Sequence, residues 1–143
     1  MNLVSPCSYQ GGKQRVAKEI VDYILNTTFL SKDTKFYDLC CGSGAVTVEL
    51  LNRGVPPENI TMCDINGILG KSSPNLNWMQ KQMVEVTNLE GKTGTLADAL
   101  VGADIFVGVS APNIVTPEMV ASMNKDSILF AMANPVPEIM PDV

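Results

Sequence analysis

The sequence predicts an α/β fold: a doubly wound, mainly parallel sheet with helices on both faces. Two observations carry this prediction. Strand-like apolar runs alternate with helix-like amphipathic runs, and the runs 105–109 and 128–133 are continuously apolar, as strands buried on both faces are. The 143 residues, 45% hydrophobic and 17% charged, suit one globular domain. We therefore expect residues 1–143 to form a single Rossmann-like domain.

The first half is expected to hold two helices and two strands in alternation. Apolar residues recur with the helical period in two runs and form short continuous blocks in two others. In order, these are a helix over 13–26, a strand over 35–41, a helix over 45–54 and a strand over 59–65. Gly54 suits the end of the second helix, because glycine readily adopts the left-handed conformation found just after many helices.

The second half begins with a stretch rich in glycine, serine and proline, which we expect to be a surface loop. The elements expected from there on are a loop over 66–77, a helix over 77–87, a helix within 95–104, a strand over 104–110, a helix from 116 and a buried strand within 127–135. Thr95 with Asp98 forms a capping-box pattern, and Thr116-Pro117-Glu118 is typical of a helix start.

Charge and cysteine content argue against several classes of protein. The net charge is −5 and basic residues gather only at Lys13, Arg15 and Lys18, so we do not expect a nucleic acid as partner. No apolar run approaches the roughly 18 residues that span a bilayer, and no export signal is evident, so we expect a cytoplasmic protein. The four cysteines lack metal-binding spacing and histidine is absent, so we expect no metal site.

A glycine turn follows the first predicted strand, at the place where doubly wound sheets bind ligands. Gly42 and Gly44 allow close approach of the backbone, and Asp38 lies within the strand that precedes them. Asp64 ends the next strand, where an acid can accept hydrogen bonds from a ribose diol. Thr47 occupies the third glycine position of GxGxxG, so a plain tight turn is the alternative. We predict a nucleoside-type ligand here.

Three segments of the first half follow one another: YQGGKQRVAKEIV, FYDLCCGSGAVTVEL and NITMCDI. Together they resemble the DNA adenine methyltransferases of bacteria and phages, over about residues 8–65. In that family the aromatic-x-GGK segment and the acidic strand with its G-x-G loop bind S-adenosylmethionine, and an acid ending the second strand takes the ribose. The resemblance implies a cofactor site made by Tyr9, Gly11, Gly12, Lys13, Asp38, Gly42, Ser43, Gly44 and Asp64.

The second half carries three other segments: ITMCDINGILGK, the long run from LNWMQKQ to IVTPEMV, and ILFAMANPVPEIMPD. They resemble the NAD-binding domain of bacterial malic enzymes, over about residues 59–143. There an acid after the second strand meets the adenosine ribose, the GVSAPN loop lines the nicotinamide side, and the asparagine of ANP contacts the nicotinamide and substrate region. The resemblance implies an NAD site that includes Asp64, Ser110, Ala111, Pro112, Asn113 and Asn134.

The two resemblances meet around NITMCDI, which is the second strand of the sheet in both families. The chain therefore resembles two families joined at one strand. Its methyltransferase-like half covers 1–65 and its malic-enzyme-like half covers 59–143. Adenine methyltransferases need a [DN]PP[YF] motif, but NPVP departs from it at Val136, and Glu138 cannot stack on a base. The acids, lysine and tyrosine that malic enzymes use lie upstream in that family. We therefore expect no catalytic residues in this sequence.

The sequence thus predicts a domain that binds an adenosine-containing cofactor, S-adenosylmethionine or NAD, without complete catalytic machinery. Asp38 favours S-adenosylmethionine over NAD, because a carboxylate attracts a sulfonium and repels a pyrophosphate. One alternative is a fragment of a malic enzyme or of an adenine methyltransferase that needs a partner, and an exposed sheet edge would then favour a homo-oligomer. The other is a folded fusion that binds nothing.

Overall fold

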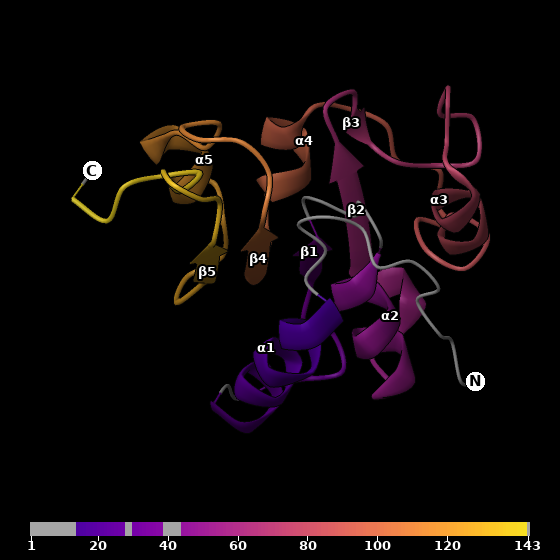
Figure 1. The fold of residues 1–143 in the computed structure, drawn as a ribbon, viewed down its shortest axis with the longest axis horizontal. Helices are drawn as coiled ribbons and strands as arrows, with labels where there is room; N and C mark the ends of the chain where they lie inside the picture. Colours follow the sequence, from indigo (N-terminus) through magenta and orange to yellow (C-terminus); the bar gives the residue numbers. More distant parts are fainter. Residues whose placement is uncertain (1–13, 28–29, 39–43, 143) are drawn as a thin grey trace.

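The computed structural model describes residues 14–27, 30–38 and 44–142, and its strands form one five-stranded sheet in the order β3-β2-β1-β4-β5 (Figure 1). Four of these strands are mutually parallel and the short β3 runs antiparallel to β2. Their bounds are β1 Phe36–Asp38, β2 Ile60–Asp64, β3 Gly67–Ile68, β4 Ile105–Gly108 and β5 Ile128–Ala131. The predicted α/β fold with a mainly parallel sheet is confirmed.

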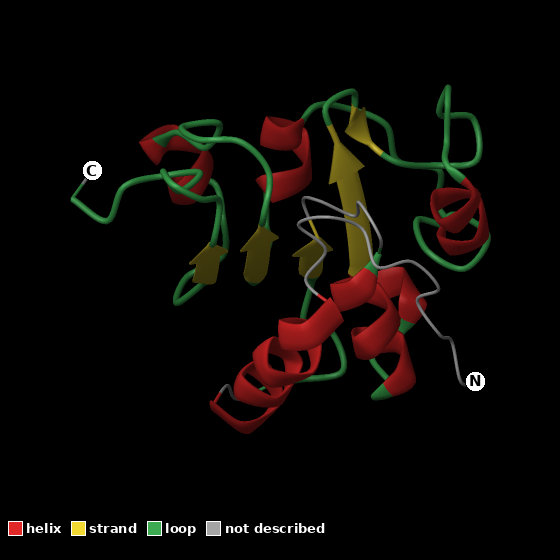
Figure 2. Cartoon of the chain, viewed as in Figure 1, coloured by secondary structure: helices red, strands yellow, loops and turns green. Residues whose placement is uncertain are grey.

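Among the described residues, five α-helices and one short 3-10 helix precede or connect the strands. They are α1 Gln14–Thr27, α2 Ala45–Asn52, the 3-10 helix η1 Pro57–Asn59, α3 Trp78–Met83, α4 Leu96–Leu100 and α5 Pro117–Ala121. The four parallel strands lie side by side with their ends pointing the same way, and the helices surround them (Figure 2). The carboxyl ends of these strands therefore lie at one edge of the sheet.

Alternate residues of the central strands enter different cores, as the two-residue period of a strand requires. Phe36 and Ile105 pack with apolar side chains of α1 and α2. Tyr37 and Phe106, their immediate neighbours in the chain, pack with side chains of α4 and with Met123 just after α5. The sheet is thus covered on both faces, which explains why β4 is apolar throughout.

The helix ends follow the local signals of the sequence. Gly54 has φ +83° just after α2, and Thr95 and Asp98 form the predicted capping box at the start of α4. The backbone N–H and the hydroxyl of Thr95 lower the pKa of Asp98. Thr116 caps α5 by accepting the N–H of Met119. These predictions are confirmed because caps depend on residues close together in sequence.

Three expectations need correction. The predicted loop 66–77 contains β3, which pairs with the end of β2. The helix predicted over 77–87 ends as an α-helix at Met83 and continues as turns. The last strand was expected to be buried, yet every residue of β5 is only half-buried. The reason is its position, because β5 is the edge strand of the described sheet and has β4 as its one neighbour.

Within the described ranges, no helix combines the length and the apolar character needed to cross a membrane. The same part of the chain contains no group of three or more acids and cysteines arranged to hold a metal ion.

Candidate functional site

The chain adds strands first on one side of β1 and then on the other, so the strand order reverses between β1 and β4. From β1 the chain passes through α2 to β2 on one side, and it later returns to place β4 on the other side of β1. In doubly wound sheets this switch point opens a crevice in which ligands bind. Asp38 lies level with Met62 of β2 and Val107 of β4, so the carboxyl ends of all three strands lie at the same edge of the sheet.

Asp38 is buried and stabilises the start of α2. Its Oδ2 atom accepts the backbone N–H of Thr47 at 3.1 Å and the Thr47 hydroxyl at 2.7 Å. The N-cap residue Gly44 is left-handed at φ 65° and offers no side-chain cap, whereas the first-turn N–H groups of any helix need acceptors from outside it. Asp38 supplies one such acceptor from the neighbouring strand. This carboxylate is therefore a structural cap for α2, whatever ligand it also meets.

Asp64 ends β2 at the same edge and is half-buried. Its Oδ1 atom accepts the N–H of Asn66 at 2.7 Å, and its backbone pairs with Gly67 of β3. Gly67 has φ +104°, and a side-chain carbon there would lie 2.1 Å from the carbonyl oxygen of Gly94. The turn that follows Asp64 is consequently fixed, and it holds the carboxylate at the strand end, where a ribose acceptor is expected.

Two loops of the second half lie against each other at the ends of β4 and β5. The backbone N–H of Asn113 donates to the carbonyl of Pro137 at 3.0 Å, and the N–H of Val115 donates to the carbonyl of Glu138 at 3.0 Å. Asn113 has φ 56°, a conformation that asparagine tolerates better than most residues do. Here the loop 109–113 and the segment 132–138 form one unit rather than two separate loops.

Glu138 is a buried acid that the sequence did not identify as part of the site. Its side chain is 0% exposed, Oε1 accepts the N–H of Ser110 at 2.7 Å, and Oε2 accepts the N–H of Ala133 at 3.0 Å. Among the described residues, every buried polar side-chain atom has a hydrogen-bond partner, including these two oxygens. An acid within the apolar, proline-rich VPEIMP segment was the available signal, because a charge there needs buried partners.

Gly108, the last residue of β4, makes room for that carboxylate. A side-chain carbon on Gly108 would lie 2.7 Å from Cδ of Glu138 and 2.8 Å from Phe106. Contacts this short do not occur in folded proteins, so the absence of a side chain lets Glu138 reach the end of the strand. The position of the Glu138 carboxylate therefore depends on glycine at position 108.

The sequence-predicted site residues have different outcomes. Asp38 and Asp64 are the last residues of β1 and β2, and Gly44 is the N-cap of α2. The exposed second-half residues lie on the loops after β4 and β5: Ser110, Ala111, Pro112, Asn113 and Asn134. The rest fall outside the described residues, namely Tyr9, Gly11, Gly12, Lys13, Gly42 and Ser43. Their role in ligand binding stays a prediction.

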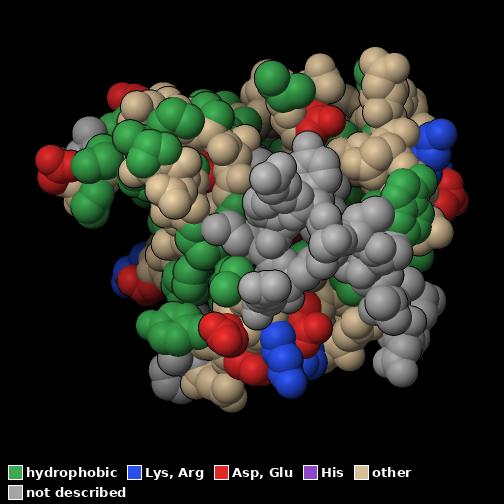
Figure 3. Space-filling view, viewed as in Figure 1, with side chains coloured by type: hydrophobic (Ala, Val, Ile, Leu, Met, Phe, Trp, Pro, Cys, Tyr) green, Lys and Arg blue, Asp and Glu red, His purple; other side chains and the backbone are tan. Residues whose placement is uncertain are grey.

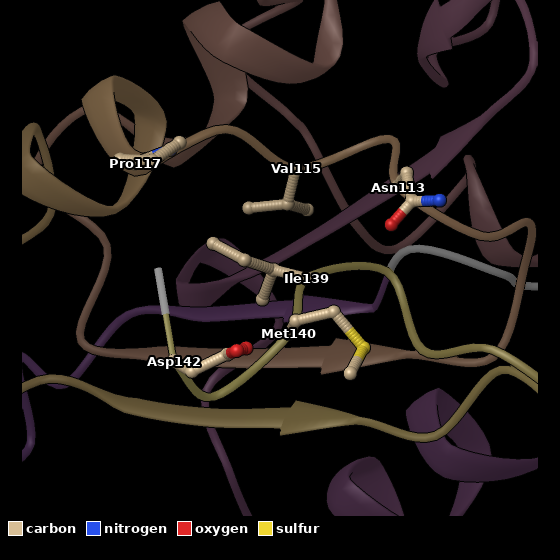
Figure 4. Close-up of a pocket in the computed structure, with 6 residues that line it drawn as sticks. All are labelled: Asn113, Val115, Pro117, Ile139, Met140 and Asp142. Carbon is tan, nitrogen blue, oxygen red and sulfur yellow. The ribbon is translucent and has the colours of Figure 1, made fainter.

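A pocket of about 300 Å³ adjoins Asn113, the last residue of the loop 109–113. Val115 and Ile139 face each other across it, and Asn113, Pro117, Met140 and Asp142 complete its wall (Figure 4). On the face shown in Figure 3, hydrophobic side chains gather at the upper left, over α5 and the C-terminal segment. Val136 and Met140 of that segment are exposed.

Comparison with protein families matches residues 9–84 to the D12 class N6 adenine-specific DNA methyltransferases. The match covers the predicted S-adenosylmethionine segments and continues through β3 and α3. It therefore extends beyond residue 65, where the sequence placed the end of the methyltransferase-like half.

Comparison with curated proteins finds malic enzymes. The chain is 45% identical over 102 residues to the bifunctional malic/malolactic enzyme of Bacillus subtilis, covering 70% of this chain and 24% of that protein. It is 40% identical over 122 residues to an NADP-dependent malic enzyme of Rhizobium meliloti, covering 80% of this chain and 15% of that protein. These shares exceed what residues 59–143 alone can supply, so the malic-enzyme likeness begins before residue 59.

Solved structures give the same result. A crystal structure of the NAD-dependent malic enzyme from Thermotoga maritima superposes with a TM-score of 0.78 and 34% identity, over 93% of this chain and 36% of that chain. The malic enzyme of Entamoeba histolytica follows with a TM-score of 0.72 and 28% identity, over 92% of this chain and 29% of that chain. The chain therefore spans well under half of each of these relatives, and the two likenesses overlap over several elements.

Proposed function

The chain belongs, through residues 9–84, to the D12 class of N6 adenine-specific DNA methyltransferases, and from this membership and its likeness to malic enzymes we propose that it binds an adenosine-containing cofactor. The observation that carries the proposal is the switch point between β1 and β4, which places Asp64 and the loop 109–113 along one edge of the sheet. Adenosine would lie over β1 and β2, with its ribose diol donating to Asp64.

NAD is the first ligand to test. In a doubly wound sheet a dinucleotide extends across the switch point, so its second nucleotide would lie over the ends of β4 and β5. The loops at those ends are ordered by hydrogen bonds between them, and Ser110, Asn113 and Asn134 are exposed there. The names of the relatives include NAD-dependent and NADP-dependent malic enzymes, which supports a dinucleotide.

S-adenosylmethionine is the second candidate, because the methyltransferase match covers the segments predicted to hold it. The sequence ranked it first on the charge of Asp38. In the structure one oxygen of that carboxylate accepts two hydrogen bonds from Thr47, so the acid also has a structural role at the start of α2. We rank S-adenosylmethionine behind NAD because the names of the relatives include NAD-dependent and NADP-dependent malic enzymes.

We further propose that this cytoplasmic, single-domain chain binds its cofactor without completing a reaction by itself. Malate oxidation or methyl transfer would then use residues from a partner or from a longer protein, since the chain spans 24% of the malic/malolactic enzyme that it matches. A second copy of the chain is one such partner.

Isothermal titration calorimetry with NAD, NADP and S-adenosylmethionine tests the proposal. We expect NAD or NADP to bind, and Asp64→Ala to weaken binding about tenfold or more, since a partly buried ribose would lose its acceptor at a cost of about 1–3 kcal/mol. Asp33→Ala is the matched control, because Asp33 lies before β1 at the opposite edge of the sheet. Absence of binding by all three ligands at millimolar concentration would overturn the proposal.

A further inference from the structure

Glu138 occupies a position that ligand binding alone does not explain. It is fully buried, and within the described part of the chain no lysine or arginine forms an ion pair with it. Its side chain instead accepts two backbone N–H groups, one from the loop after β4 and one from the segment after β5. Burying a carboxylate is costly unless such bonds satisfy it, and bonds to a charged acceptor are strong and short.

The two donors belong to the two loops at the second half of the crevice. Ser110 begins the exposed stretch of the first loop, and Ala133 immediately precedes the exposed Asn134 in the second. Glu138 therefore fixes the backbone of both loops at the sheet edge while their side chains remain exposed. The backbone bonds of Asn113 and Val115 join the same loops farther from the strand ends. The loops would thus stay together without the carboxylate, but with a less defined geometry next to β4 and β5.

From this arrangement we propose that Glu138 is a positioning residue for the nicotinamide of the second nucleotide of a bound dinucleotide. The inference rests on the proposed function, because it assigns that nucleotide to the ends of β4 and β5. Gly108 contributes to this arrangement, because its lack of a side chain leaves room for the Glu138 carboxylate at the end of β4. Asp64 lies beyond β1 on the other side of the switch point, so the adenosine end of the ligand is independent of Glu138.

Comparing the affinities for NAD and ADP-ribose distinguishes a positioning role of Glu138 from general damage to the structure. ADP-ribose carries the adenosine, the pyrophosphate and the second ribose of NAD and lacks only the nicotinamide ring. In Glu138→Gln the side chain keeps its size, yet its amide NH₂ replaces one acceptor and faces a backbone N–H donor. We expect the affinity for NAD to fall about tenfold in this variant while the affinity for ADP-ribose changes less than twofold. Glu85→Gln, an exposed acid after α3, is the matched control and should change neither.

Gly108→Ala provides a second variant that reaches the same contact without altering the acid, and it should show the same split between the two ligands. Both affinities are measured by calorimetry on variants whose circular dichroism matches that of the unaltered protein. The positioning role would be overturned if a folded variant lost equal affinity for NAD and ADP-ribose, or lost affinity for neither. The proposed function would still stand. If the unaltered protein binds neither ligand, the proposed function and this inference both fall.

Discussion

Asp38 and Glu138 are both buried carboxylates at the carboxyl edge of the sheet, but they stabilise different spans of the chain. Asp38 uses one oxygen for two donors of a single residue, Thr47, nine positions along. Glu138 uses both oxygens for donors on two loops, 28 and 5 positions away. The first is a local cap that joins a strand to its own helix, and the second joins loops that follow different strands.

The two acids differ in the hydrogen-bond donors that would lose an acceptor if the acid were removed. Thr47 is 0% exposed, so its N–H and hydroxyl would have no acceptor and no access to water. Ser110 is exposed and Ala133 is half-buried, so water can replace the Glu138 carboxylate for those donors. We therefore expect Asp38 to matter more for stability and Glu138 more for the geometry of a binding surface.

The largest expected effect on stability is that of Asp38→Ala. Two buried donors lose their acceptor at about 1–3 kcal/mol each, so the free energy of unfolding should fall by about 2–6 kcal/mol. Urea denaturation followed by circular dichroism measures this change. Asp38→Asn keeps one acceptor oxygen and is the matched control, with a smaller loss. A loss below about 1 kcal/mol in Asp38→Ala would show that the cap of α2 is not needed.

The next effect is that of Gly108→Ala on the Glu138 side. The added carbon would lie 2.7 Å from the carboxylate, and such overpacking typically costs about 1–3 kcal/mol. In a Glu138→Ala background the same substitution should cost clearly less, because the obstructing side chain is gone. A double-mutant cycle by urea denaturation yields this coupling energy. A coupling near zero would mean that Phe106, the other close neighbour, causes the whole penalty.

Local features of the sequence predicted the Asp38 side of this comparison better than the Glu138 side. The strand, the turn at Gly44 and the following helix are consecutive, and their periodicity and glycine content indicate them directly. The contact between Glu138 and Ser110 depends on the parallel pairing of β4 with β5, which no local pattern encodes. The acid was visible in the sequence, but only the fold shows that it is buried.

The same reasoning explains the other differences. The capping box at Thr95 was predictable because its two partners are three residues apart. β3 was missed because two residues carry no periodicity, and its pairing depends on the contact of Gly67 with Gly94. The apolar sequence of β5 correctly indicated a strand. Its half exposure depends on which strand forms the edge of the sheet, and composition does not reveal that.

The smallest expected effect concerns the other face of β1, where Tyr37 follows Phe36 and precedes Asp38. Its phenol lies in the core beside α4, and burial raises its pKa above the ordinary 10.0, against the opposing influence of Lys92 and of a hydrogen bond with Thr61. The folded protein therefore keeps the phenol proton at pH values where the unfolded chain has begun to lose it. This contribution to stability is complete below about pH 10 and is lost as the pH rises through the folded-state pKa.

Tyr37→Phe should remove this alkaline loss. At neutral pH the variant lacks the bond with Thr61 and should be less stable by about 0.5–1.5 kcal/mol, but above about pH 10 its unfolding free energy should fall less steeply than that of the unaltered protein. Urea denaturation at a series of pH values from about 8 to 11 measures both slopes. Asp38→Asn keeps the phenol and serves as the control, so it should retain the full alkaline loss. Parallel slopes for Tyr37→Phe and the unaltered protein would show that the proton of Tyr37 is not held by the fold, and that the two faces of β1 differ in packing but not in titration.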